Sequence, residues 1–116
     1  MTNLKDMNML PENQWIDVCN LDDITPNTGV GALVEGQSVA LFRVGHEKRI
    51  YALSNKDPFS QANVMCRGII GDLQGERVIA SPIYKQHFSL ATGRCLEDKD
   101  QKLLVFPTKI ESGRVW

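Results

Sequence analysis

The sequence predicts an all-β protein made of a single domain with short antiparallel strands. Its length of 116 residues fits one domain, because domains usually contain roughly 100 to 200 residues. β-Branched and other apolar residues recur in short runs bounded by glycine, whereas apolar stripes with helical spacing are scarce. Together these patterns indicate about ten strands joined by tight turns.

The first half of the chain is expected to form an antiparallel meander. Val39, Leu41 and Val44 are the core candidates in its clearest strand pattern. Glu35-Gly36-Gln37 supplies a glycine-containing hairpin connection, and Thr25–Gly29 is expected to be a turn. The strands expected in this half are Trp15–Cys19, Val30–Val34, Ser38–Val44 and Arg49–Ser54.

Two proline-containing loops, Asn55–Ser60 and Ser81–Gln86, interrupt the strands of the second half. Proline fixes φ and removes a backbone donor, so neither loop can continue a regular strand. A short helical turn fits within Ala62–Ile70, and the charged run Glu97–Asp100 is expected to be a solvated loop. Strands are expected at Glu76–Ala80, His87–Leu90, Arg94–Leu96, Leu103–Ile110 and Arg114–Trp116, with Pro107 at an edge or a bulge.

The charge and hydropathy of the chain argue against several classes of function. Thirteen Lys and Arg residues against fourteen Asp and Glu residues give a formal net charge of -1. No excess of positive charge is therefore available for nucleic acid or an anionic membrane surface. No apolar run exceeds four residues, whereas a membrane-spanning helix needs about 20, so no membrane span is expected.

The start of the chain lacks the apolar segment of a secretory signal. We therefore expect residues 1–12 to form a loose tail, residues 13–116 to form the domain, and the protein to be cytoplasmic. Cys19, Cys66 and Cys95 are odd in number and widely spaced, so they fit neither a disulfide framework nor a structural zinc site. These thiols are expected to be free and buried.

The two loops and the strands beside them resemble the half-motifs of Rieske proteins. Ser81–Gly93 is similar to the second half-motif, in which Cys-Pro-x-His-Gly is followed by an aromatic residue, an apolar residue and Thr-Gly. Tyr51–Phe59 resembles the strand and loop that end in Cys-x-His, Arg67-Gly68 fits the glycine that follows, and Pro107–Val115 resembles the closing hairpin. The resemblance implies a Rieske-like sandwich of antiparallel sheets, with a small cluster-binding-like subdomain formed by the two loops.

The residues that would bind a Rieske cluster are missing from this subdomain. A Rieske [2Fe–2S] centre needs two Cys thiolates on one iron and two His nitrogens on the other. By the resemblance, Asp57 and Phe59 stand at the first Cys and His positions, and Ser81 and Tyr84 stand at the second. Phenyl cannot coordinate iron, and hydroxyl groups are poor substitutes for thiolate and imidazole. We therefore expect no cofactor and no metal in this chain.

A variant of the Rieske domain without these ligands is found in the small subunits of cytoplasmic NADH-dependent nitrite reductases, and the chain is similar to that family. The similar segments are Trp15–Cys19, Leu21–Ile24, Thr28–Val30, Val39–Arg43, Ser54–Phe59, Arg67-Gly68 and Ala80–Pro82. The resemblance implies a large subunit as partner, with FAD, siroheme and a [4Fe–4S] cluster, that reduces nitrite to ammonium in nitrate and nitrite assimilation. The chain would support that subunit and be inactive alone. The alternatives are a ferredoxin-like electron carrier and a stand-alone interaction domain of another redox system.

Two roles are open for the residues of the emptied loops. Phe59 and Tyr84 could fill the volume of the missing cluster, because an empty cavity is costly in a protein core. Alternatively, an exposed apolar tip could dock on the large subunit, formed by Pro58, Phe59, Pro82, Tyr84 and Lys85. Asp57 is expected to form a turn by bonding local amides, and His87 is expected to be a partly exposed strand residue.

Overall fold

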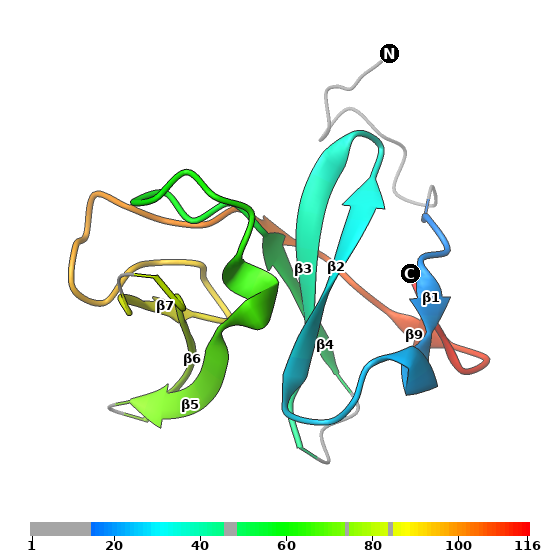
Figure 1. Cartoon of the computed structure of the whole chain (residues 1–116). Helices are drawn as coiled ribbons and strands as arrows, with labels where there is room; N and C mark the ends of the chain where they lie inside the picture. Colours follow the sequence, from blue (N-terminus) through cyan, green and yellow to red (C-terminus); the bar gives the residue numbers. More distant parts are fainter. Residues whose placement is uncertain (1–14, 46–48, 74, 84) are drawn as a thin grey trace.

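The computed structural model describes residues 15–45, 49–73, 75–83 and 85–116, whose arrangement is shown in Figure 1. Within these ranges ten strands form three antiparallel sheets, which confirms the all-β prediction. The strands are β1 (Cys19–Asn20), β2 (Thr28–Val34), β3 (Gln37–Arg43), β4 (Ile50–Ser54), β5 (Ile69–Leu73), β6 (Glu76–Ala80), β7 (His87–Ser89), β8 (Val105–Phe106), β9 (Ile110–Glu111) and β10 (Arg114–Val115). The predicted tail at 1–12 lies outside the described residues.

The helical segments of the described residues are two short 3₁₀ turns. They are η2 (Leu21–Asp23) and η3 (Met65–Arg67), and η3 confirms the helical turn predicted within Ala62–Ile70. Among the described residues, no helix has the length and apolar character that crossing a membrane would require.

The central sheet has the strand order β2-β3-β4-β8 and occupies the middle of the molecule in Figure 1. β2 and β3 pair along their whole lengths and end with Val34 opposite Gln37. The two residues between the strands, Glu35 and Gly36, have positive φ angles of 49° and 82°. Positive φ at both positions suits the twist of a two-residue hairpin, and the predicted hairpin is confirmed.

The small sheet has the order β5-β6-β7 and lies to the left of the central sheet in Figure 1. Ile79 of β6 stands in register with Ile70 of β5 and with Phe88 of β7. β5 is missing from the strands predicted by sequence. Ile69 is 74% exposed and Ile70 is only partly buried, so the apolar pattern of this edge strand does not mark an inner and an outer face.

The third sheet has the order β1-β10-β9 and differs most from the sequence prediction. The single strand predicted over Leu103–Ile110 is wrong, because β8 and β9 belong to different sheets and Pro107, which has no N–H to donate, separates them. β1 begins at Cys19 rather than at Trp15. The strand predicted at Arg94–Leu96 is also wrong, since that segment forms only isolated bridges.

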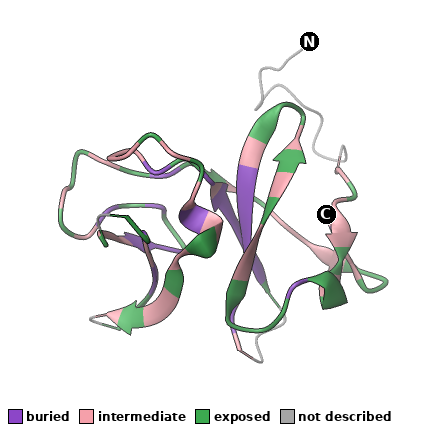
Figure 2. Cartoon of the chain, in the orientation of Figure 1, coloured by how far each residue is buried: buried purple, intermediate pink, exposed green. Residues whose placement is uncertain are grey.

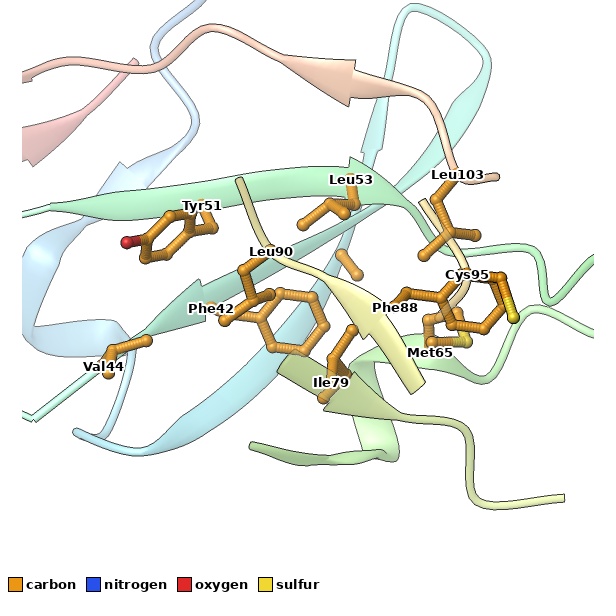
Figure 3. Close-up of a cluster of buried hydrophobic side chains, with 11 residues drawn as sticks. Phe42, Val44, Tyr51, Leu53, Met65, Ile79, Phe88, Leu90, Cys95 and Leu103 are labelled. Atoms are coloured by element: carbon orange, nitrogen blue, oxygen red, sulfur yellow. The ribbon is translucent and has the colours of Figure 1, made fainter. Parts of the chain in front are cut away.

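β3 is buried on both faces because it lies between the two hydrophobic clusters of the core (Figure 2). Val39 and Leu41 pack in the cluster that includes residues of the third sheet, whereas Phe42 packs in the cluster that includes residues of the small sheet. Figure 3 shows the cluster that contains Phe42, with Ile79 and Phe88 of the small sheet among its labelled side chains. The cluster around Phe42 therefore holds the small sheet to the central sheet. The cluster around Val39 and Leu41 holds the third sheet to it.

Candidate functional site

The first loop of the small subdomain is anchored to the central sheet by Asn55, which is 4% exposed. Its side-chain NH₂ group donates to the Ser38 hydroxyl at 3.1 Å and to the Asn63 carbonyl at 3.3 Å, and its Oδ1 accepts the Cys66 N–H at 2.8 Å. Asparagine suits this position because one amide can donate and accept at the same time. The base of the loop is thereby fixed on β3.

Asp57 organises the turn of this first loop. It is fully buried, and its Oδ1 accepts the backbone N–H of Phe59 at 2.9 Å. Its own backbone N–H donates to the Ala62 carbonyl at 2.9 Å, and its carbonyl accepts the Gln61 N–H at 2.7 Å. The prediction that Asp57 forms a turn by bonding local amides is therefore confirmed.

The second loop is closed by Ser81 at its start. The backbone N–H of Ser81 donates to the Gln86 carbonyl at 2.9 Å, and its hydroxyl oxygen accepts the Ile83 N–H at 3.3 Å. Pro82 and Lys85 are exposed, and Ile83 is 44% exposed. The loop therefore turns its polar start inward and presents an apolar side chain to solvent.

A side-chain hydrogen bond between Asp57 and Ser81 joins the two loops. The Ser81 hydroxyl donates to Asp57 Oδ2 at 2.5 Å, and the two residues are 0% and 1% exposed. A hydroxyl that donates to an ionised carboxylate at this distance makes a strong, charge-assisted bond. The Rieske resemblance assigns these residues to the two Cys positions, which bind one iron, and the structure brings them into direct contact.

Phe59 packs toward the core of the small subdomain. It is half-buried, and its ring centroid lies 6.2 Å from that of Phe88, with the ring planes tilted by 51°. It also packs against the buried cluster drawn in Figure 3. This contact agrees with packing, which is one of the two roles left open for Phe59. Tyr84, the other aromatic residue assigned to that role, lies outside the described residues.

His87 of β7 is hydrogen-bonded to Glu97 beside the second loop. The Glu97 carboxylate accepts the His87 backbone N–H at 2.8 Å and lies 2.6 Å from the ring Nδ1. Burial by itself raises the pKa of Glu97, but the hydrogen bonds and charge of His87 outweigh it and hold this pKa below its ordinary value. His87 is half-buried in its strand, as predicted, and sequence analysis missed Glu97 as its partner.

The three cysteines are free, as predicted, but only one of them is fully buried. Cys95 is 3% exposed, whereas Cys19 and Cys66 are partly exposed, which corrects the prediction of three buried thiols. Burial raises the pKa of the Cys95 and Cys19 thiols, and the nearby Asp23 carboxylate raises that of Cys19 further. Both thiols are therefore protonated at neutral pH.

The residues at the expected ligand positions do not fit a [2Fe–2S] cluster. Two tetrahedral ligands about 2.3 Å from one metal lie more than ~3 Å apart, which is farther than the contact between Asp57 Oδ2 and Ser81 Oγ. Phe59 has no lone pair to offer. Within the described ranges, no group of three or more His, Cys, Asp and Glu side chains is arranged to hold a metal ion. The contact between Asp57 and Ser81 is suited to holding the two loops in place, with their outer surface presented to solvent.

Two facing loops beside a three-stranded sheet, joined to a larger antiparallel sheet, define a Rieske-type domain. The chain matches the Rieske-like [2Fe-2S] domain family over residues 14–116, which is nearly its whole length, and it belongs to that family.

Within this class the chain belongs to the small subunits of NADH nitrite reductase. It is 44% identical over 103 residues to the nitrite reductase (NADH) small subunit of Salmonella typhimurium, an alignment that covers 89% of this chain and 95% of the relative. The NMR structure of the Escherichia coli protein NirD is 43% identical and superposes with a TM-score of 0.81, covering 88% of this chain and 93% of that one. The family expected from the sequence is therefore confirmed.

A third relative contains a similar domain within a much longer chain. The nitrite reductase [NAD(P)H] large subunit of Klebsiella oxytoca is 42% identical to this chain over 107 residues. The aligned segment covers 92% of this chain but 11% of that protein. In the Klebsiella protein, a domain similar to this chain is thus covalently part of the large subunit.

Proposed function

We propose that this chain is the non-catalytic small subunit of a cytoplasmic NADH-dependent nitrite reductase, and that it supports the reduction of nitrite to ammonium by binding the large subunit. The 44% identity to the Salmonella small subunit over nearly the full length of both chains carries this proposal. The Klebsiella large subunit supports the choice of partner, because covalent linkage keeps the two parts at a high effective concentration.

We assign the redox cofactors of the reaction to the large subunit. FAD, siroheme and a [4Fe–4S] cluster are the groups that the family resemblance implies for that subunit. The contact between Asp57 and Ser81 supports a role without electron transfer for this chain, because it occupies the place of two cluster ligands. The small subunit then acts by binding and orienting the large subunit, and the reaction serves nitrite assimilation.

The second loop is the part of the small subdomain that we propose to contact the large subunit. Ile83 is 44% exposed, and Pro82 and Lys85 on either side of it are also exposed. A partly exposed apolar side chain beside a cationic one is a suitable centre for a protein interface, since buried apolar groups supply binding energy and charges set orientation. Tyr84 belongs to the tip predicted from the sequence, and its part in docking stays a prediction.

The first loop contributes less of its surface to this proposed contact. Pro58 and Phe59 are half-buried, and the ring of Phe59 is directed to Phe88. We therefore place both residues at the edge of the docking surface, with packing as the main role of Phe59.

Reconstitution with the large subunit from the same organism tests the proposed function. The purified chain is titrated into the large subunit, and nitrite-dependent NADH oxidation and ammonium formation are measured. We expect both rates to rise and to saturate as the chain is added. Rates that do not respond to the chain would contradict the proposal, and visible absorption with stoichiometric iron in the purified chain would favour the electron carrier instead.

Variants of the exposed and packed residues test the proposed docking surface. Ile83→Ala should raise the concentration of chain needed for half-maximal stimulation without lowering the melting temperature. Phe59→Ala should mainly lower the melting temperature and change the half-maximal concentration less, because it removes an aromatic contact with Phe88. Leu33→Ala, which changes a side chain that is 77% exposed on β2, is the control and should alter neither value.

A further inference from the structure

The hydrogen bond between Asp57 and Ser81 is part of a longer chain of hydrogen bonds that crosses from one loop to the other. The Ile83 N–H donates to the Ser81 hydroxyl oxygen at 3.3 Å, and the same hydroxyl donates to Asp57 Oδ2 at 2.5 Å. The other carboxylate oxygen accepts the Phe59 N–H at 2.9 Å. Backbone groups of both loops are thus connected through two side chains that stand 24 positions apart in the sequence.

The burial of this chain makes each of its bonds important. Asp57 and Ser81 are 0% and 1% exposed, so water does not replace a lost partner easily. Within the described part of the chain, no Lys, Arg or His forms an ion pair with Asp57. The carboxylate therefore depends on its hydrogen-bond donors, and the Ser81 hydroxyl is the donor that comes from the other loop.

An iron–sulfur cluster bound by ligands from both loops would join those loops through metal–ligand bonds. Asp57 and Ser81 do not fit such a cluster, but they join the loops at the same two positions by direct contact. We propose that the Asp57–Ser81 hydrogen bond replaces the cluster as the link between the loops, and that it positions Ile83 to contact the large subunit. The second half of this inference rests on the proposed function.

The geometry explains why the link acts on Ile83. The Ser81 hydroxyl oxygen accepts a hydrogen bond from the Ile83 backbone N–H. The position of the hydroxyl therefore constrains the position of that peptide group. Asp57 in turn fixes the hydroxyl, and the first loop that carries Asp57 is fixed on β3 through Asn55. Asp57 and Ser81 are therefore positioning residues for a contact that neither of them makes.

Hydrogen exchange of the backbone amides tests the link in the free chain. Ser81→Ala and Asp57→Asn should speed exchange of the Ile83 amide by about tenfold, because each variant removes or weakens a charge-assisted bond. Ser81→Thr keeps the hydroxyl and should restore slow exchange. Ser60→Ala is the matched control, since the Ser60 hydroxyl accepts the Ala62 N–H at 3.3 Å within the first loop. Unchanged exchange in both Ser81→Ala and Asp57→Asn would overturn the link.

Titration of the same variants into the large subunit tests the positioning role. We expect Asp57→Asn and Ser81→Ala to raise the half-saturating concentration of the chain by about tenfold and to leave the maximal rate unchanged. The double variant should be no worse than the weaker-binding single variant, because both changes remove the same bond. Additive losses would overturn the positioning role, and Ser60→Ala should behave as the wild type.

The two measurements separate failure of this inference from failure of the proposed function. Faster exchange with an unchanged half-saturating concentration would overturn the positioning role while the proposed function stands. No stimulation by the wild-type chain would overturn the proposed function, and the positioning role with it. The exchange rates would then still decide whether the hydrogen bond links the loops.

Discussion

The central sheet and the two loops of the small subdomain are stabilised by different kinds of interaction. β3 buries Val39, Leu41 and Phe42 between two apolar clusters, so the sheet is held by many contacts of similar strength. The loops are held by a few directional bonds, of which the contact between Asp57 and Ser81 crosses from one loop to the other. A sheet of the first kind tolerates volume-conserving changes, whereas loops of the second kind depend on individual donors and acceptors.

This difference explains how the domain keeps its shape without the Cys and His ligands of a Rieske cluster. The sheets depend on apolar burial, which is independent of a metal, and they bring the two loops together. The loops then need a cross-link at one point, and a carboxylate with a hydroxyl donor provides it. The scaffold and the site can therefore change independently of each other.

Removal of a core aromatic ring should have the largest effect on stability. Phe42 is fully buried in the cluster of Figure 3, and Phe42→Ala should lower the free energy of unfolding by about 3 to 5 kcal/mol. Leu33→Ala on the neighbouring strand is the control and should change it by less than about 0.5 kcal/mol, since Leu33 is 77% exposed. Urea unfolding measures both values, and similar losses in the two variants would contradict the assigned core.

A methyl group added beside the loops should have an intermediate effect. A Cβ atom at Gly68 would press on the Ala80 carbonyl oxygen and lie 3.0 Å from the Ile79 side chain, whereas one at Gly71 meets nothing within 4 Å. Gly68→Ala should therefore cost about 1 to 3 kcal/mol by overpacking, and Gly71→Ala much less. Thermal unfolding of the two variants tests this, and equal melting temperatures would refute the close approach of Gly68, the residue that follows η3, to β6.

Acid should abolish the small stabilising effect of Glu97. The folded-state pKa of this carboxyl is below its ordinary value of 4.5, because hydrogen bonds and charge from His87 outweigh the opposing effect of burial. Its stabilising contribution is complete above the unfolded-state pKa and disappears as the pH falls through the lowered folded-state pKa. Glu97→Gln should melt below the wild type at pH 7, and the difference should shrink in acid.

The control for the acid experiment is Glu76→Gln, at an exposed position on β6. This variant should melt close to the wild type at every pH. A difference between Glu97→Gln and the wild type that is the same at pH 7 and in strong acid would show that the contact with His87 does not depend on the charge of Glu97.

The parts of the fold that could be predicted from sequence are those where local pattern and burial agree. The hairpin at Glu35 and Gly36 is an example, because its turn residues lie between two apolar runs. β5 could not be predicted, because Ile69 is an exposed apolar residue at the edge of a sheet. The split at Pro107 could have been foreseen from its missing N–H, but the different sheets of β8 and β9 are set by tertiary packing.

Only part of the bonding within the two loops could be predicted from sequence. The local bond from the Phe59 amide to Asp57 follows from turn chemistry two residues apart. The bond between Asp57 and Ser81, like that between His87 and Glu97, joins residues that are distant in sequence. A signal for the bond between Asp57 and Ser81 was available in the sequence. The family resemblance places a carboxylate and a hydroxyl at the two Cys positions, which must be adjacent because they bind one iron.

We propose that this domain supports nitrite reduction without iron of its own. The most direct test is to purify the chain from iron-starved and from iron-replete cells, measure its iron, and add each preparation to the same large subunit. We expect equal nitrite-dependent NADH oxidation from both preparations, with no stoichiometric iron in either. A rate that rises with iron bound to this chain, together with a Rieske-type EPR spectrum, would contradict it.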